Sequence, residues 1–562
     1  MPFFTVFRGL AVCMLVAPVL VVLTAWLQWD AASAAVWQGL LDTVLPDYTA
    51  TSLLLCALVA FGVVSIGSVS AAAVTLFEFP GRQALAWLLL LPLAMPAYVV
   101  AYAYTDFLQY SGPLQNWLRL QTGWQGALWP DIRSTWGAAV VLSLSLYPYV
   151  YLLCRSALAE RAPQLMEAAR LLGAGLMRRI FRVALPLARP AIAAGLALAM
   201  METLADFGVS SYFGVQTFST GIYKAWLVMD NRVAAAQLSS VLLFIVAVVL
   251  WLEHRAQKRL RFANRRGAMR SNESQPLRLF GWRAALACVL CLLPVLLGFV
   301  FPLLIMGHAL WVGSQQQALP WAAFMGWFWN SLQLGGISAV LAAAMALWLA
   351  HGLRTRPTWW RRLSAQLAGL GYAVPGVVIV VGLLLPLSWV QQQWPDSGAG
   401  YWLTATLLGL IWAYLVRFIA VALQSVQSGY ARIPVSADES ARMLGSRGRD
   451  VFVRVHWPLL RPTVASALLL VWVDVMKELP ATLVLRPFNT DTLAVMAYQL
   501  ARDERLGEAA LPSLALVLAG LLPVLLMAKA QQKKASMCRG HSNANDSHLV
   551  ILRVLPRNNL CS

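Results

Sequence analysis

The chain has 562 residues, of which 60% are hydrophobic and 12% charged, with a formal net charge of +19. Soluble domains carry about 25% charged residues, so this composition excludes an ordinary soluble protein and indicates a membrane protein. The positive charge does not indicate a nucleic-acid partner, because lysine and arginine lie in short segments between apolar spans, as expected for cytoplasmic loops.

Twelve segments are long and apolar enough to cross a membrane as helices. Six lie in each half of the chain, which predicts an all-α membrane protein built from two six-helix halves. The predicted spans are 10–28, 52–77, 84–105, 136–154, 190–212, 233–252, 284–306, 330–351, 365–389, 401–423, 462–484 and 510–527.

Charge predicts the orientation of these spans and the limits of the halves. Nine basic and two acidic residues lie between 253 and 283, whereas 30–50 and 308–329 contain no lysine or arginine. Basic loops stay in the cytoplasm, so both termini are predicted to be cytoplasmic. The expected organisation is a first half (1–253), a basic cytoplasmic linker (254–283), a second half (284–530) and a disordered cytoplasmic tail (531–562). The linker is either a solvated loop or a contact for anionic membrane lipid.

A polar stretch occurs twice in this apolar chain. Residues 167–190 read EAARLLGAGLMRRIFRVALPLARP, and residues 439–462 read ESARMLGSRGRDVFVRVHWPLLRP. A constant offset of 272 aligns them without a gap, placing Glu167 on Glu439 and Gly173 on Gly445. Self-similarity at a fixed offset indicates an internal duplication.

Each copy combines a helical pattern, a glycine turn and a second basic helix. Gly173 and Gly445 suit a turn that a side chain would obstruct. The apolar pairs at 171–172 and 443–444 are predicted to lie in water, which is typical of a docking face. Prolines 186 and 458 are predicted to end the second helix, and prolines 190 and 462 to begin the next span.

The repeated stretch resembles the EAA signature of importer-type ABC transporter permeases: Glu-Ala-Ala, three residues, Gly, and an aliphatic-x-Leu-Pro ending. The second copy departs from it at Ser440 and Trp457. In that family the segment is a cytoplasmic helix that couples to the ATPase subunit; the alternative is an ordinary amphipathic loop helix. The resemblance implies coupling roles for Glu167, Ala168, Ala169, Leu172, Gly173, Pro186, Glu439, Ala441, Leu444, Gly445 and Pro458.

Nothing in the sequence indicates catalysis by the chain itself. It contains no Gly-Lys dipeptide, hence no Walker A motif, and neither Gly-x-Ser-x-Gly nor His-Glu-x-x-His. We therefore expect a transport subunit that is not an enzyme and binds no cofactor, with ATP used by a partner ATPase.

Three stretches narrow the resemblance to the two-half, single-chain permeases of ferric-iron importers. They are LPLAMPAYVVAYAYTDFL (91–108), MMETLADFGVSSYFGVQTFSTGIYKAW (200–226) and the segment that begins VDVMKELPATLVLRPF (473–488). The resemblance implies a bacterial inner-membrane location, a dimer of ATPase subunits and a periplasmic ferric-iron-binding protein. Related permeases carry thiamine, polyamines, sulfate or phosphonates, so these cargoes stay open. An ion-driven secondary transporter is the alternative from a different class.

Four carboxylates in predicted spans are candidates for a translocation path. Glu202 and Asp206 align with Asp474 and Glu478, and the i,i+4 spacing predicts that each pair shares one helix face. Charged groups in a membrane usually face a cavity or a partner, and carboxylate and phenol oxygens suit hard cations such as Fe(III). The alternative is a structural role, with Lys477 pairing with Asp474. The candidate path residues are Glu202, Asp206, Asp474, Glu478, Tyr98, Tyr102, Pro96 and Pro375.

The sequence fixes no metal site. Tyr98, Tyr102 and Tyr104 are candidate phenol ligands or members of an aromatic belt at the membrane edge. The lone His456 is expected to make a surface contact and not to bind a metal.

Overall fold

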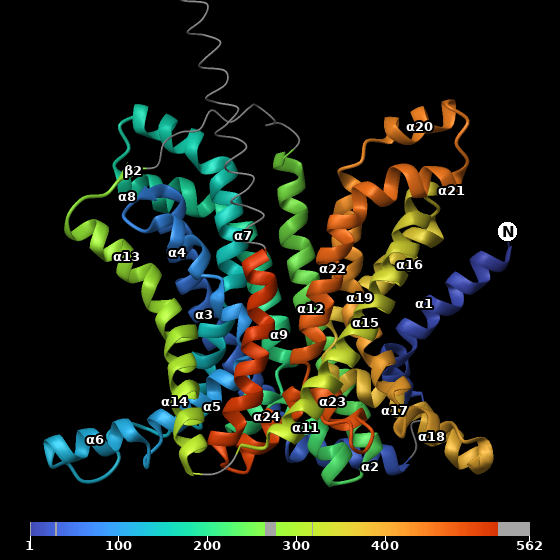
Figure 1. The fold of residues 1–562 in the computed structure, drawn as a ribbon, viewed down its shortest axis with the longest axis horizontal. Helices are drawn as coiled ribbons and strands as arrows, with labels where there is room; N and C mark the ends of the chain where they lie inside the picture. Colours follow the sequence, from blue (N-terminus) through green and yellow to red (C-terminus); the bar gives the residue numbers. More distant parts are fainter. Residues whose placement is uncertain (1, 28–30, 265–276, 317–318, 527–562) are drawn as a thin grey trace, which may run out of the picture.

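In the computed structural model, residues 2–27, 31–264, 277–316 and 319–526 are described. They form two helical lobes that lie together at one end and separate toward the other (Figure 1). A parallel ladder pairs β1 (Phe77–Glu78) with β2 (Leu277–Arg278), in the register Phe77 to Leu277 and Glu78 to Arg278.

The helices of the first half follow the predicted spans, with short helices between them. Their bounds are α1 Pro2–Leu23, α2 Ala31–Asp42, α3 Leu45–Leu76, α4 Arg82–Leu88, α5 Ala97–Leu108, α6 Pro113–Thr122, α7 Thr135–Leu171, α8 Leu176–Arg179, α9 Leu185–Ala205, α10 Gly208–Tyr212, α11 Phe218–Tyr223 and α12 Arg232–Asn264. Short 3₁₀ and π turns lie at Thr24–Trp26, Leu91–Ala94, Ile180–Ala184 and Lys224–Val228.

The second half repeats this order. Its helices are α13 Trp282–Val295, α14 Phe301–Gln316, α15 Trp321–Thr355, α16 Trp359–Gly369, α17 Gly376–Gln393, α18 Ala399–Thr404, α19 Leu407–Ala431, α20 Val435–Met443, α21 Gly448–Val451, α22 Trp457–Lys477, α23 Pro480–Leu485, α24 Leu493–Arg502 and a last helix Leu506–Leu526. Its 3₁₀ and π turns are Leu296–Val300, Gly371–Ala373, Pro395–Ser397 and Phe452–His456.

Among the described residues, eleven helices are long and apolar enough to span a membrane, and one bent pair raises the number to twelve. The predicted all-α membrane fold is therefore confirmed. The bent pair joins Arg82–Ala94 to Ala97–Thr122 at 89°, so the predicted span 84–105 is broken at Pro96, where a proline is expected to kink the helix. The chain turns because Met95 precedes a proline and adopts an extended conformation (φ −97°, ψ 125°).

Three more predicted spans are interrupted. In the ninth, 365–389, α16 ends at Gly369 and α17 begins at Gly376, after Pro375. In the fifth and eleventh, α9 ends at Ala205 and α22 ends at Lys477, and a short helix follows each. Interrupted helices at membrane depth free backbone groups, which is tolerated where they are buried in protein or line a cavity.

The two halves exchange their first helices. Helix α1 packs against α16 and α17 of the second half, whereas α13 packs against α3 and α4 of the first. Helix α12 continues to Asn264, into the predicted linker. Residues 265–276 of that linker and the predicted tail, 531–562, lie outside the described residues.

Candidate translocation cavity and coupling loops

Both copies of the repeated stretch end their first helix with the same backbone motif. Gly173 and Gly445 have φ values of +78° and +82°, a conformation that favours glycine. Ala174 N–H bonds Ala169 O at 2.9 Å, and Ser446 N–H bonds Ala441 O at 3.0 Å. Together with the bonds from Gly173 to Arg170 and from Gly445 to Arg442, these contacts form a Schellman motif in each half. The predicted glycine turns are confirmed.

The apolar pairs before these turns lie in solvent, as predicted. Leu171 and Leu172 are 85% and 88% exposed, and Met443 and Leu444 are 88% and 86% exposed. Glu167 and Glu439 are exposed on the same helices. We refer to residues 167–173 and 439–445 as the first and second coupling loops; in Figure 1 they lie at the separated ends of the two lobes.

The prediction that Pro186 and Pro458 end a helix is wrong. Each lies near the start of a helix that continues a preceding π turn: Leu185 N–H bonds Ile180 O, and Trp457 N–H bonds Phe452 O. The wider π turn accommodates prolines that offer no N–H. The result is one helical span from Leu176 to Ala205 and another from Gly448 to Lys477. Each span connects a coupling loop directly to the interior.

The expected surface contact of His456 is also wrong. Its side chain is 2% exposed, and Nε2 lies 2.9 Å from Asp438 Oδ1. The sequence places it in a basic segment, but the π turn rotates it toward α20.

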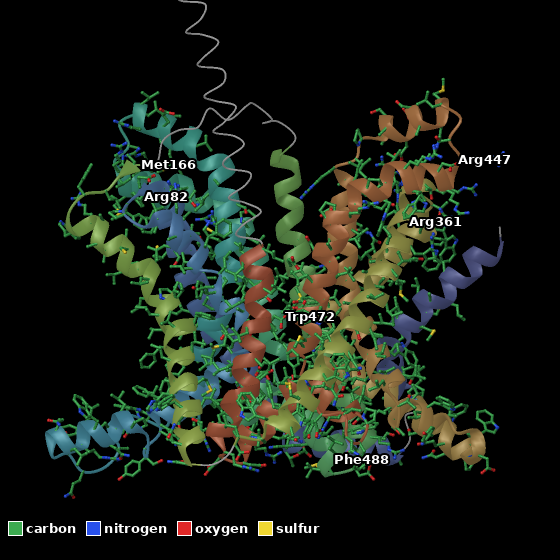
Figure 2. All side chains as sticks on the ribbon, in the orientation of Figure 1. Arg82, Met166, Arg361, Arg447, Trp472 and Phe488 are labelled. Atoms are coloured by element: carbon green, nitrogen blue, oxygen red, sulfur yellow. The ribbon has the colours of Figure 1, made fainter. Side chains whose placement is uncertain are left out.

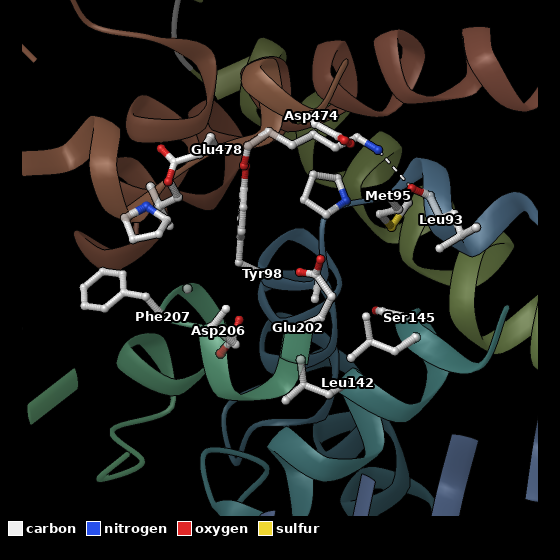
Figure 3. A pocket seen from close by; sticks show the side chains of 18 of the residues that line it. Leu93, Met95, Tyr98, Leu142, Ser145, Glu202, Asp206, Phe207, Asp474 and Glu478 are labelled. Atoms are coloured by element: carbon white, nitrogen blue, oxygen red, sulfur yellow. Dashed lines mark hydrogen bonds between the residues drawn. The ribbon is translucent and has the colours of Figure 1, made fainter. Parts of the chain in front are cut away.

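A cavity of about 210 Å³ lies between the halves where the interrupted helices meet. Figure 3 shows Glu202 and Asp206 on one side and Asp474 and Glu478 on the other. The cavity is lined by Pro92, Leu93, Met95, Pro96, Ala97, Tyr98, Leu142, Ser145, Leu146, Tyr149, Glu202, Ala205, Asp206, Phe207, Gly208, Tyr372, Arg417, Phe418, Asp474, Lys477, Glu478, Leu479 and Pro480.

The second carboxylate of each pair caps the short helix that follows it. Asp206 accepts hydrogen bonds from Ser210 N (2.9 Å) and Ser210 Oγ (2.9 Å). Glu478 accepts them from Thr482 N (2.9 Å), Thr482 Oγ1 (2.6 Å) and Ala481 N (3.0 Å). Both carboxylates lie one residue past a helix in extended conformation, so the prediction that each i,i+4 pair shares a helix face is wrong.

Glu202 and Asp474 lie within the last turn of α9 and α22 and line the cavity from opposite halves. The phenols of Tyr149 and Tyr372 lie beside both carboxylates. Four oxygen-bearing side chains from four helical segments therefore converge on one volume.

Two cations belong to the second half of the cavity. Arg417 Nη1 lies 3.3 Å from Glu478 Oε1. Lys477 Nζ donates to the carbonyl oxygen of Leu93 at 2.9 Å, the contact drawn dashed in Figure 3. The expected pairing of Lys477 with Asp474 is not among the ion pairs within 4.0 Å in the described part of the chain.

Some of the aromatic and proline candidates line the cavity and others do not. Pro96 and Tyr98 line the cavity, and Tyr98 OH donates to Lys477 O at 3.5 Å. Tyr102 is fully buried against Tyr98 and Tyr212 and does not line it. Pro375 does not line the cavity; it immediately precedes α17, whose Gly376 lies against Arg417 and Glu478.

Sequence reasoning missed Arg417, Tyr149 and Tyr372. Arg417 could have been found, because it is a charged residue inside the predicted span 401–423. The two tyrosines carry no such signal, since isolated aromatic residues in membrane helices are common. Within the described ranges, no group of three or more His, Cys, Asp or Glu side chains is arranged to hold a metal ion.

The comparisons with known proteins agree on one family of membrane transport proteins. The family described as "Binding-protein-dependent transport system inner membrane component" matches residues 63–262 and 342–535. The chain is 25% identical over 497 residues to the "Fe(3+)-transport system permease protein FbpB 2" of Haemophilus influenzae, covering 86% of this chain and 90% of that protein. It is 23% identical to the "Ferric transport system permease protein FbpB" of Actinobacillus pleuropneumoniae, covering 74% of this chain and 61% of that protein.

Shorter matches reach permeases with other cargoes in their names. The "Sulfate transport system permease protein CysT" of Escherichia coli is 32% identical over 137 residues, which is 24% of this chain and 46% of that protein.

Proposed function

The chain belongs to the family of binding-protein-dependent transport system inner membrane components, and on this premise we propose that its cargo is ferric iron. Membership makes it a multi-pass inner-membrane permease of an ABC importer, without enzymatic activity or a cofactor of its own. It also implies an ATPase and a substrate-binding protein as partners. The ion-driven alternative has no support from this family.

The observation that carries the cargo proposal is the convergence of oxygen groups in the cavity. Glu202 and Asp474 approach from the two halves, and Tyr149 and Tyr372 lie beside them. Carboxylate and phenolate oxygens are hard ligands that suit Fe(III). The similarity to two ferric transport permeases over most of the chain supports the same cargo. A cation that passes must bind weakly enough to leave, which fits a partial ligand set.

The coupling loops are proposed to seat on two ATPase subunits in the cytoplasm. Their exposed leucine and methionine side chains offer the apolar contact. The 30-residue span Leu176–Ala205 begins just after the first loop and carries Glu202 in its last turn. A helix of that length covers about 45 Å, so movement of the ATPases would reach the cavity through one rigid element.

The orientation follows from the same proposal. The beginning of α1 lies at the end of the molecule that carries the coupling loops (Figure 1), which supports a cytoplasmic N-terminus. The opposite end, where α11, α23 and α24 gather, would then receive the periplasmic binding protein. Cysteine labelling from outside should reach residue 316 but not residue 265.

The cargo is tested by stimulation of ATP hydrolysis in the reconstituted complex of permease, ATPase and binding protein. Ferric-loaded binding protein should raise hydrolysis over the unloaded form. The same assay with a sulfate-, thiamine- or polyamine-binding protein should give no rise. Stimulation by one of these and not by the ferric form would overturn the cargo proposal and leave the permease assignment in place.

An anionic cargo is the second candidate, and a specific observation favours it. Arg417 and Lys477 bring two cations to the cavity, and Arg417 Nε is buried without a hydrogen-bond partner in the described chain. The partial similarity to a sulfate permease points the same way. Sulfate-dependent stimulation in the assay above would select it.

A further inference from the structure

The two coupling loops are attached to their membrane helices in different ways. In the first half, α7 runs unbroken from Thr135 to Leu171 and ends at the loop's glycine turn. In the second half, α19 ends at Ala431 and the nine-residue α20 begins at Val435. Pro434 stands between them in extended conformation (φ −63°, ψ 148°). A helix this short is marginal alone, so the second loop needs another means of holding its place.

An ionic network supplies contacts at this break. Arg354, in the last turn of α15, donates from Nη2 to Ile433 O (3.0 Å) and Pro434 O (3.1 Å). Its Nε lies 3.0 Å from Asp438 Oδ2. The other oxygen of Asp438 lies 2.9 Å from His456 Nε2, on the π turn that leads into α22. One carboxylate on α20 thus joins α20 to two membrane spans.

The network is shielded from water. The side chains of Arg354, Asp438 and His456 are 17%, 9% and 2% exposed. Burial alone raises the pKa of the Asp438 carboxyl, but the hydrogen bonds from Arg354 and His456 outweigh it, and the pKa lies below its ordinary value. Asp438 is therefore a carboxylate at neutral pH. Breaking one side of a buried pair is far more damaging than losing an exposed one.

Aromatic groups complete the surroundings of His456. His351 lies 5.7 Å from it between ring centroids, and His351 Nδ1 is 3.1 Å from Tyr430 OH. Phe452 packs on both histidines. These contacts fix the ring of His456 so that Nε2 faces Asp438.

The first half keeps the arginine of this network but not its partners: the offset of 272 places Arg82 at the position of Arg354, and Arg82 pairs with Glu78 instead. The same offset places Met166 at the position of Asp438 and Ala184 at that of His456. Both are buried, at 6% and 0% exposure, and Figure 2 marks Met166 within the upper part of its lobe. An apolar contact suffices there because α7 is continuous through the site.

We propose that Asp438 is a positioning residue, held by Arg354 and His456, that fixes the second coupling loop to α15 and α22. The ionic network replaces the helix continuity that holds the first loop. The further step, that this attachment transmits ATPase movement to the second half, rests on the proposed function.

Hydrogen exchange on the purified full-length permease tests the attachment without cargo or partners. In His456→Ala and in Asp438→Asn, amides of residues 435–443 should exchange at least about tenfold faster than in the wild type, a change of about 1.4 kcal/mol in opening free energy. His456→Gln should stay close to the wild type, because its amide nitrogen can donate to the same oxygen. Met166→Leu, which keeps the volume of the apolar contact, is the matched first-half control and should change exchange at 165–171 by less than about threefold. Unchanged exchange at 435–443 in both loss variants would overturn the proposal.

A second readout in the complex with the ATPase tests transmission. His456→Ala should raise the ATP hydrolysed per cargo molecule imported while the ATPase still co-purifies, and His456→Gln should restore the ratio. Faster exchange with an unchanged ratio would overturn the transmission step. Because the hydrogen-exchange experiment uses neither cargo nor ATPase, its result does not depend on whether the proposed cargo is correct.

Discussion

The membrane helices that follow the two coupling loops share a backbone and differ in the charges around them. Leu172 and Leu444, the residues before the two glycine turns, have the same φ and ψ of −81° and 11°. Helices α9 and α22 both contain 21 residues and stop one residue before a capping carboxylate. In these segments the duplicated sequence has kept the glycine turn, the π turn before the membrane helix and the break before the capping carboxylate.

The side chains on this shared backbone have diverged at the cavity. The first half contributes Ser145 and Ala205 where the second contributes Arg417 and Lys477, at the same offset of 272. Each half also contributes two carboxylates. The first-half wall (Ser145, Glu202, Ala205 and Asp206) is thus anionic, whereas the second-half wall (Arg417, Asp474, Lys477 and Glu478) carries equal numbers of acids and bases. Duplication gave the two halves the same architecture, and substitutions made the charges of the two cavity walls unequal.

The largest effect is expected when Arg417 of the second half is replaced by serine, the residue at the aligned first-half position 145. Arg417→Ser should destabilise the permease by about 3–5 kcal/mol, because it leaves Glu478 buried without its ionic partner. The matched variant Ser145→Ala should change stability by less than about 1 kcal/mol, because Ser145 Oγ has no hydrogen-bond partner among the described residues and no bond is lost. Thermal unfolding in detergent measures both. Equal melting temperatures for the two variants would mean that the ionic pair between Arg417 and Glu478 does not stabilise the fold.

Substitution of either turn glycine should have a similar effect, because the two turns have the same backbone conformation. A Cβ atom at Gly173 or Gly445 would meet no atom within 4 Å, so the effect of substitution is expected to come from the positive φ. Gly173→Val and Gly445→Val should each cost about 1–3 kcal/mol at the turn and weaken co-purification of the ATPase by a similar factor. If one half tolerates valine and the other does not, the loops are not equivalent docking elements.

Removal of the two capping carboxylates should destabilise the permease to different extents. Asp206→Ala removes the cap of α10 and should destabilise by about 1 kcal/mol, within the range for N-cap losses. Glu478→Ala should cost more, since it also leaves Arg417 without its partner. Unfolding temperatures in the order wild type, Asp206→Ala, Glu478→Ala are expected. The reverse order of the two variants would contradict the assignment of the ionic pair to the second half.

The smallest effect concerns pH and the Asp438 network. The pKa of Asp438 is lower in the folded protein than in the unfolded chain, so its stabilising contribution is complete above about pH 4 and is lost as the pH falls through the lowered folded value. The difference in unfolding temperature between the wild type and Asp438→Asn should therefore stay constant from neutral pH to about pH 5 and shrink below pH 4. A difference that grows on acidification would show the opposite sign of coupling.

Much of the fold could be predicted because membrane spans and repeats leave strong patterns. Twelve apolar segments, the duplicated loop and the glycine turns follow from composition, spacing and backbone preference. The breaks at Ala205 and Lys477 do not, since α9 and α22 are apolar on both sides of them. The roles of Asp206 and Glu478 depend on those breaks, and only the folded chain separates these caps from Glu202 and Asp474.

Interactions between distant segments were also invisible in the sequence. Arg417 and Glu478 are 61 residues apart, and Arg354 and Asp438 are 84 apart, so no local spacing predicts either pair. His456 could not be placed in the interior, because a basic stretch gives no sign of a π turn. The exchange of α1 and α13 between the halves likewise depends on packing that a repeat cannot encode.

The role proposed for Glu202 and Asp474 is to help a ferric cation through the cavity. It is tested most directly by uptake of radioactive iron into vesicles that contain the permease, the ATPase and the ferric-binding protein. The double variant Glu202→Gln with Asp474→Asn should reduce uptake on the order of tenfold, about 1.4 kcal/mol, while membrane abundance and ATPase assembly are retained. The control, Asp131→Asn with Asp396→Asn, removes the same charge from exposed positions outside the cavity and should transport normally. Uptake by the cavity variant equal to that of the control would contradict the claim.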